Sequence, residues 1–268
     1  MPVPNNSLTQ MMAGKLEGGT LEVKLDRYGR IVQNKHLAGD FYKMTFDTGE
    51  CGFTRPGQFA IIEAEGIRRP FQVCEFDSNR FTIVFKADDE VGQTLARQRE
   101  GSEMLVQTGL GNGYDVDLIP DGAILAADSK GIPEMLGLAR ELLMHGKNCR
   151  MVLGYSSKKD IFMLDSFRNL VNDIEVLTLD GSNGREGTPP DAVRNADYIC
   201  ASGSAEMLKK LASKTAEGQF SVSCAVIVIS ADYDDCLLDT VDGVVNSCDA
   251  GPVFDKNAVI WDRLEQIS

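Results

Sequence analysis

The sequence predicts two lobes, an antiparallel β-barrel followed by an α/β lobe with a parallel sheet. Residues 21–110 contain short runs that alternate apolar and polar side chains, and residues 109–116 (GLGNGYDV) then interrupt this pattern with three glycines. From about residue 120, short apolar strands alternate with helical segments. A chain of 268 residues is long enough to bury a core in each lobe.

The barrel prediction rests on a period of two. Residues 42–46 (YKMTF) and 81–85 (FTIVF) carry an apolar side chain at every second position, which is typical of half-buried strands. Turn signals such as Arg55-Pro56-Gly57 separate the runs. Short strands divided by turns predict a small antiparallel barrel.

The α/β lobe is predicted from strands and helices in alternation. Residues 123–127 read as an apolar strand, and apolar side chains between 135 and 143 then recur at helical spacing. Further strands are expected at 150–154, 174–179 and 197–201, and further helices at 165–171 and 205–213. This alternation predicts a parallel sheet with helices on its faces.

Charge and hydropathy exclude several classes of partner. The net charge of −13 would repel nucleic acid and an anionic membrane surface, so we expect neither. No apolar run is long enough for a transmembrane helix, and residues 1–20 lack the pattern of a secretory signal. Seven scattered cysteines indicate free thiols. We therefore expect a cytoplasmic protein with a flexible N-terminal extension over residues 1–20.

A series of motifs runs along the chain. Its members are residues 55–64 (RPGQFAIIEA), 68–73 (RRPFQV), 110–114 (LGNGY), 153–162 (LGYSSKKDIF), 201–208 (ASGSAEML) and 248–254 (CDAGPVF). Together they resemble, over about residues 28–261, the electron-transfer subunits of dihydroorotate dehydrogenase, a branch of the ferredoxin-reductase family. The resemblance implies an FAD-binding-type barrel at 21–116, a Rossmann-like NAD-binding-type domain at 117–220, and at 221–268 a remnant of a 2Fe–2S subdomain.

FAD is the cofactor that this resemblance implies for the barrel. The family motif R-P-x-S corresponds to residues 69–72, where Arg69 is suited to grip a pyrophosphate and Phe71 to pack against the flavin. Gln72 replaces the family's Ser or Thr. The candidate flavin-binding residues are Arg69, Pro70, Phe71, Gln72, Val73, Gly92 and Thr94. The alternative is that Arg69 pairs with an acidic neighbour and that Phe71 fills the barrel.

The second phosphate loop of the family, G-x-G-T, corresponds to residues 86–94 (KADDEVGQT). Gly92 and Thr94 could offer a backbone amide and a hydroxyl to a phosphate. Asp88, Asp89 and Glu90 instead bring negative charge to the expected position of the pyrophosphate. Each like charge at a partly shielded site would cost on the order of a few kcal/mol.

The nucleotide site departs further from the family pattern. A glycine-rich run normally lets phosphates approach a helix N-terminus, but here residues 127–133 (ADSKGIP) follow the first strand. Ser202 and Ser204 replace the Cys and Pro expected near the nicotinamide, and Ser204 is also an ordinary helix N-cap. The candidate residues for NAD(P)H are Gly131, Gly154, Ser157, Lys158 and Gly203. The sequence leaves open whether a nicotinamide nucleotide binds, and which one.

We expect no 2Fe–2S cluster and no other metal. The family holds its cluster on C-x4-C-x2-C and a later Cys, because each iron needs two thiolates. Cys236 and Cys248 match two of these four positions, whereas Ala231 and Asp239 occupy the other two. Residues 225–229 (AVIVI) predict a buried strand that packs over the vacated space or faces a partner subunit.

The resemblance implies a flavin-dependent subunit that passes electrons between NAD(P)H and a partner redox subunit through FAD. The implied partner is a catalytic subunit such as an FMN-containing dehydrogenase, in a hetero-oligomer; a homodimer is the other arrangement considered. The alternative, which the altered motifs favour, is a redox-silent structural or regulatory subunit of the same fold, because fold does not fix function. A third hypothesis is a module that binds another nucleotide in the α/β cleft.

Overall fold

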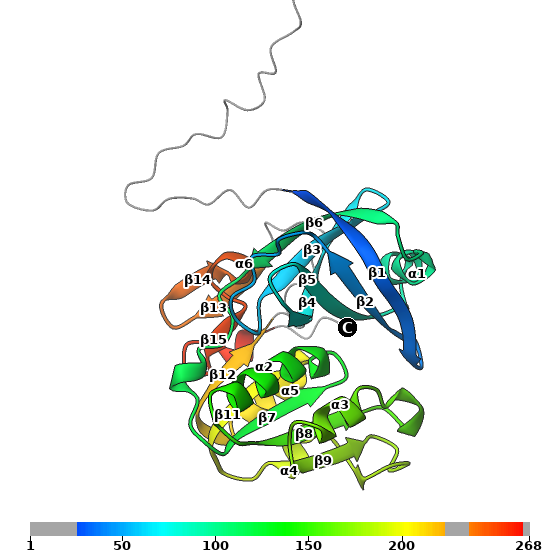
Figure 1. Ribbon diagram of the computed structural model, residues 1–268. Coiled ribbons are helices and arrows are strands. Elements are labelled where there is room, and N and C mark those ends of the chain that lie inside the picture. Colours follow the sequence, from blue (N-terminus) through cyan, green and yellow to red (C-terminus); the bar gives the residue numbers. More distant parts are fainter. Residues whose placement is uncertain (1–25, 223–235, 265–268) are drawn as a thin grey trace, which may run out of the picture.

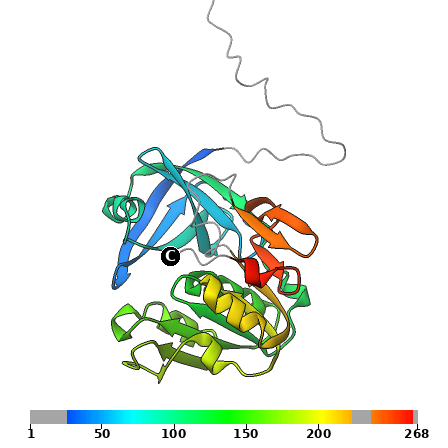
Figure 2. The same cartoon turned by 180° about the vertical axis from the view of Figure 1, so that it is seen from behind.

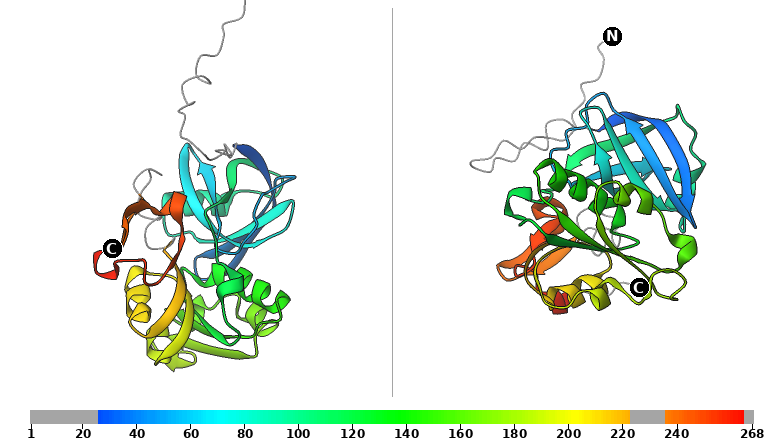
Figure 3. Two further views of the ribbon diagram at one scale, coloured as in Figure 1. Left: turned by 90° about the vertical axis from the view of Figure 1, so that its left-hand side faces the viewer. Right: turned by 60° about the horizontal axis from the view of Figure 1, so that its bottom comes forward.

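A computed structural model describes residues 26–222 and 236–264. The barrel and the α/β lobe lie against each other, with the C-terminal segment beside both (Figure 1 and the left view of Figure 3). The expected N-terminal extension and the strand expected at 225–229 lie outside the described residues. Among the residues described, no helix is long and apolar enough to cross a membrane.

The barrel is closed and antiparallel, with strand order β1-β2-β5-β4-β3-β6. Its elements are β1 (Arg27–Ala38), β2 (Phe41–Asp47), β3 (Phe59–Ala64), β4 (Ile67–Phe76), β5 (Arg80–Lys86), α1 (Glu90–Arg97) and β6 (Glu103–Leu110). The predicted period of two is confirmed at its centre. Phe46 on β2 lies opposite Phe81 on β5, and their rings stack 5.0 Å apart in the core.

The α/β lobe has a seven-stranded sheet of order β10-β9-β8-β7-β11-β12-β15, parallel except for β15. Its elements are η1 (Val116–Leu118), β7 (Ala123–Asp128), α2 (Ile132–Met144), β8 (Cys149–Tyr155), η2 (Lys158–Asp160), α3 (Leu164–Arg168), β9 (Asp173–Thr178), β10 (Arg185–Glu186), α4 (Pro189–Ala192), β11 (Ala196–Ser202), α5 (Ala205–Ala212) and β12 (Thr215–Ser221). The predicted parallel sheet is confirmed, although the helix expected at 165–171 ends at Arg168.

Both faces of this sheet are covered. Leu125 and Ala127 on β7 pack in one core with α2, whereas Ala126 belongs to a second core with α5. Figures 1 and 2 accordingly show α2 in front of the sheet from one side and α5 from the other. The near-continuous apolar sequence of β7 follows from burial on both faces.

The C-terminal segment belongs to more than one part of the molecule. It contains β13 (Leu237–Thr240), β14 (Gly243–Asn246), α6 (Ser247–Ala250), β15 (Val253–Asp255) and η5 (Trp261–Arg263). β13 and β14 form a separate hairpin, while β15 pairs with β12 of the α/β sheet. Asn112, in the connection between the lobes, donates to the Val253 carbonyl at 2.7 Å and accepts from the Val253 amide at 3.1 Å. The segment is therefore fastened to that connection.

Candidate functional site

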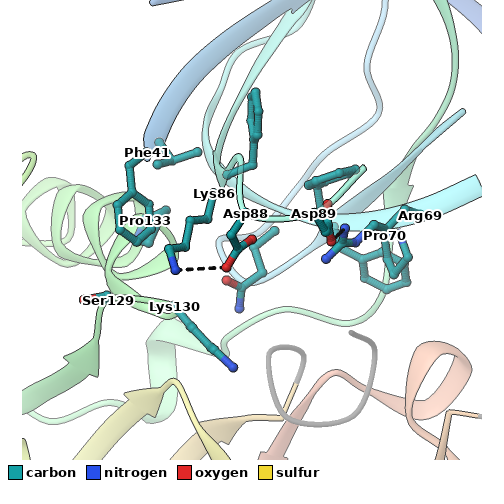
Figure 4. A pocket seen from close by; sticks show the side chains of 14 residues that line it. Phe41, Arg69, Pro70, Lys86, Asp88, Asp89, Ser129, Lys130 and Pro133 are labelled. Carbon is teal, nitrogen blue, oxygen red and sulfur yellow. Dashed lines mark hydrogen bonds and ion pairs between the residues drawn. The ribbon is translucent and has the colours of Figure 1, made fainter. Parts of the chain in front are cut away.

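A pocket of about 390 Å³ opens between the barrel and the start of α2 (Figure 4). The barrel supplies most of its wall, and the loop after β7 and the first turn of α2 supply the rest. The lining residues are Phe41, Phe59, Arg69, Pro70, Phe71, Gln72, Val84, Phe85, Lys86, Asp88, Asp89, Ser129, Lys130 and Pro133. An apolar cavity with a few converging polar groups is the usual form of a small-molecule site.

Aromatic rings and one guanidinium line the barrel side of the pocket. Phe71 and Phe85 meet edge to face, with ring centroids 6.2 Å apart. Arg69 lies two positions before Phe71 on β4, so both side chains are on the same face of the strand. The Arg69 guanidinium carbon is 5.8 Å from the centroid of the Phe71 ring. This wall suits a planar aromatic ligand that carries negative charge at one end.

The cations on the barrel side are already paired with carboxylates. Arg69 Nη1 contacts Asp89 Oδ2, and Lys86 Nζ lies 2.9 Å from Asp88 Oδ2 (Figure 4). Asp89 also caps α1, because its Oδ1 accepts a 2.7 Å hydrogen bond from the Gly92 amide. Partial burial opposes ionisation of Asp89, but the Gly92 amide and Arg69 outweigh it and hold the pKa of this carboxyl below its usual value.

The structure brings together four of the seven candidate flavin residues. Arg69, Pro70, Phe71 and Gln72 line the pocket, whereas Val73 belongs to the barrel core, and neither Gly92 nor Thr94 lines the pocket. A Cβ at position 92 would lie 2.3 Å from the Lys86 carbonyl oxygen, so packing already requires this glycine. Both parts of the alternative raised from the sequence also occur: Arg69 pairs with Asp89, and Phe71, besides lining the pocket, packs in the barrel core.

A buried polar cluster joins the lobes behind the pocket. Gln72 Nε2 donates to Glu134 Oε2 and, at 3.1 Å, to Ser202 Oγ. Ser202 Oγ donates to the same Glu134 oxygen at 2.8 Å. Glu134 and Ser202 are both 0% exposed. We define Gln72, Glu134 and Ser202 as the interlobe cluster; the positions that depart from the family at 72 and 202 therefore contact each other.

Sequence reasoning missed Glu134. Its only signal is a carboxylate in the first turn of a helix whose other side chains are mostly apolar. A charged group in that setting is almost never fully buried unless it is hydrogen-bonded. Its two partners lie 62 and 68 positions away in the sequence, so local pattern cannot identify them.

A second carboxylate lies at the nucleotide edge of the α/β lobe. Asp128 ends β7, where the carboxyl ends of parallel strands form the usual ligand crevice. Its Oδ2 accepts from the Ser204 amide, just before α5, at 2.9 Å, and its Oδ1 accepts from the Lys130 amide at 3.1 Å. A Cβ on Gly203 would lie 2.6 Å from Asp128 Oδ1. Asp128 thus holds amides that could otherwise bind an anion.

The other nucleotide candidates do not line the pocket either. The space beside Gly131 is filled by the Ser202 carbonyl, 1.9 Å from a Cβ built there, and the space beside Gly154 by the Pro189 ring, 2.6 Å from one. Ser157 donates to Asp160 at 2.8 Å, and the Lys158 amide donates to Ser182 at 2.7 Å. Ser129 and Lys130 line the pocket from this lobe instead.

Cys236 and Cys248 are both buried beside the β13–β14 hairpin. A hydrogen bond with the Cys236 thiol, together with burial, raises the pKa of Cys248. Asp239 pairs with Arg263 at 3.1 Å, and Ala231 lies outside the described residues. No group of three or more His, Cys, Asp or Glu in the described ranges is placed to hold a metal ion. The expected absence of a 2Fe–2S cluster stays a prediction.

Solved structures extend the likeness beyond sequence. An NADH-dependent reduced ferredoxin–NADP oxidoreductase, studied for flavin-based electron bifurcation, superposes with a TM-score of 0.76 and 26% identity over 88% of this chain and 91% of that chain. Phthalate dioxygenase reductase, which transfers electrons from pyridine nucleotides to a [2Fe–2S] centre, shares the fold at a TM-score of 0.62 and 17% identity, over 70% of this chain and 64% of that one.

Curated relatives identify the family. No family model matches the chain. The dihydroorotate dehydrogenase B (NAD(+)) electron transfer subunit of Lysinibacillus sphaericus is 28% identical over 86% of this chain and 96% of the relative. The subunit of the same name from Bacillus pumilus is 30% identical over 69% of this chain and 76% of the relative. The chain belongs to the family of dihydroorotate dehydrogenase B electron transfer subunits.

Proposed function

We propose that the protein is a flavin-dependent electron-transfer subunit that holds FAD in the interlobe pocket and passes electrons between NAD(P)H and a partner redox subunit. The observation that carries this proposal is the position of the pocket. Four residues of the flavin motif line it on the barrel side, and the start of the nucleotide lobe closes it on the other. Bound FAD would supply acceptance of a hydride and release of single electrons.

The pocket lining as it stands suits the ring of a flavin, whereas binding of the flavin phosphates requires one side chain to move. Phe71 and Phe85 give the ring an apolar wall, and the Gln72 amide gives it a polar neighbour. Arg69 would bind phosphate oxygens through paired hydrogen bonds. This requires Asp89 to release the guanidinium. The Asp89 side chain is 44% exposed, which leaves it room to turn toward solvent.

The nicotinamide nucleotide would approach from the α/β lobe. Ser129 and Lys130 line the pocket there, and the Lys130 ammonium can attract phosphate. These residues replace the candidate glycines as the groups that we expect to meet NAD(P)H.

For a partner, the relatives' name supports the catalytic subunit of a dihydroorotate dehydrogenase. The β13–β14 hairpin offers an apolar surface for it. Leu237 is 59% exposed and Val244 61% exposed, and they share a face of the hairpin because Val244 lies opposite Asp239. Leu237 and Val244, with Asp239 between them, are the side chains that we expect the partner to contact.

The test is the flavin content of the full chain, alone and co-expressed with that catalytic subunit. We expect a flavin absorption spectrum, FAD in the acid extract, and bleaching of the spectrum by NADH or NADPH in the absence of oxygen. A colourless protein whose Tm is unchanged by FAD, FMN, NADH and NADPH would contradict the proposal and support a redox-silent subunit.

A further inference from the structure

Two groups form an anion-binding position at the Arg69 end of the pocket. The guanidinium of Arg69 reaches it from β4, and the Gly92 amide points to it from the first turn of α1. Both favour negative charge: the guanidinium by its own charge, and the amide as a first-turn donor at the positive end of a helix dipole. This end of the pocket is the one where the phosphates of a flavin would lie.

Asp89 fills this position with a carboxylate of the chain itself. One of its oxygens contacts Arg69 while the other accepts from Gly92. The neighbouring Asp88 pairs with Lys86 in the same way. Both basic side chains that the barrel contributes to the pocket are therefore ion-paired with a carboxylate from residues 88–89.

Helix capping explains the hydrogen bond between the Gly92 amide and Asp89, but it does not explain the ion pair of Asp89 with Arg69. Asn, Ser and Thr cap helices about as well as Asp, and any of them would satisfy the Gly92 amide. None of them would neutralise Arg69. The negative charge of Asp89 is therefore not needed for the helix cap, and it competes with an anionic ligand for Arg69.

We propose that Asp89 determines specificity in this pocket by competing with phosphate for Arg69 and the start of α1, so that flavins carrying phosphate bind more weakly and exchange more readily. The proposal rests on the proposed flavin site. Riboflavin, which has no phosphate, is not subject to this competition. The expected selectivity for FMN or FAD over riboflavin is small in the natural chain and larger once the charge is removed.

The experiment measures dissociation constants of riboflavin, FMN and FAD for the full chain and for Asp89→Asn, by quenching of flavin fluorescence at neutral pH and low salt. Asn keeps the cap and removes the charge. We expect Asp89→Asn to bind FAD and FMN roughly tenfold more tightly and riboflavin within about twofold of the natural chain. Asp115→Asn is the matched control, because Asp115 caps η1 by accepting from the Asp117 amide at 3.2 Å, outside the pocket lining.

Equal or weaker FAD binding by Asp89→Asn would overturn the proposal, as would an equal gain for riboflavin. Asp89→Ser repeats the test with another uncharged N-cap residue that has a shorter side chain. The proposal can then still be tested if Asp89→Asn does not fold. If flavins bind without this discrimination, only the role of Asp89 fails. If neither the natural chain nor the variants bind any flavin, the proposed function fails with it.

Discussion

The Arg69 end of the barrel pocket and the edge of the α/β lobe at Asp128 share one feature but differ in the space that they leave for a ligand. Each has an Asp that accepts hydrogen bonds from amides at the start of a helix, Asp89 at α1 and Asp128 at α5. Beside Asp89 a pocket of about 390 Å³ remains open. At the edge that holds Asp128, the space beside Gly131 is filled by a backbone carbonyl and the space beside Gly154 by a proline ring.

The difference lies in what blocks each site. At the barrel the obstacle is a half-exposed side chain, which can rotate away. At the α/β edge it includes the Ser202 carbonyl, a backbone group at the end of β11, whose movement would disturb the pairing of that strand with β7 and β12. A glycine retained in a motif therefore does not by itself show that space for a ligand is retained.

The largest effect is expected from Gly131→Ala. A Cβ there would lie 1.9 Å from the Ser202 carbonyl oxygen, so β11 and α2 must separate, and we expect a loss of about 2–3 kcal/mol in the free energy of unfolding. Urea denaturation measures it. Gly49→Ala is the control, because it has no atom within 4 Å and only a positive φ, for which we expect about 1 kcal/mol. Equal losses in the free energy of unfolding for Gly131→Ala and Gly49→Ala would show that the space beside Gly131 is not filled.

Arg69→Ala comes next. It removes the guanidinium that would bind flavin phosphate, and we expect about 30-fold weaker FAD binding, or roughly 2 kcal/mol. The flavin content of the purified protein and titration with FAD measure this. Arg80→Ala is the matched control, since Arg80 forms its ion pair with Asp47 outside the pocket lining. Unchanged flavin content in Arg69→Ala would remove Arg69 from the site.

Asp128→Asn should have a smaller effect than the corresponding change at Asp89. If backbone atoms rather than charge limit the α/β edge, removal of the Asp128 charge should improve NADH binding by less than about threefold. Isothermal titration with NADH, compared with FAD binding to Asp89→Asn, measures the contrast. A tenfold gain at Asp128 would mean that both sites are limited by charge and would end the comparison drawn above.

The smallest effect concerns pH. Because the pKa of Asp89 is lowered, its carboxyl group is still ionised at a pH equal to the usual pKa of Asp. It is protonated only as the pH falls through the lowered pKa. The ratio of FAD affinities between Asp89→Asn and the natural chain should therefore be constant from about pH 5 to 8 and shrink only at more acidic pH. A ratio that changes between pH 6 and 8 would assign the competition to another group.

The fold was predictable from the sequence because its signals are local. The period of two in β2 and β5 and the helical spacing in α2 are set by which face of each element is buried. The charge conflict at Asp89 was also predictable, since the family motif fixes where a phosphate would lie. The interlobe cluster was not, because Gln72 and Ser202 are 130 positions apart.

Gly131 and Gly154 show the limit of motif reasoning most directly. Their sequence contexts resemble nucleotide-binding loops, but the atoms that approach them belong to Ser202 and Pro189, on other elements. Packing between elements that are distant in the sequence decides whether such a loop leaves space for a ligand, and the local motif does not contain that information.

The interlobe cluster also sets how the molecule can admit a ligand. A hinge rotation that parted the barrel from α2 would break the hydrogen bonds by which Gln72 joins Glu134 and Ser202, so the cluster opposes wide separation of the two lobes. Entry and exit should then depend on rotamer changes at the rim of the pocket. Small-angle scattering profiles recorded with and without a bound flavin should accordingly superimpose.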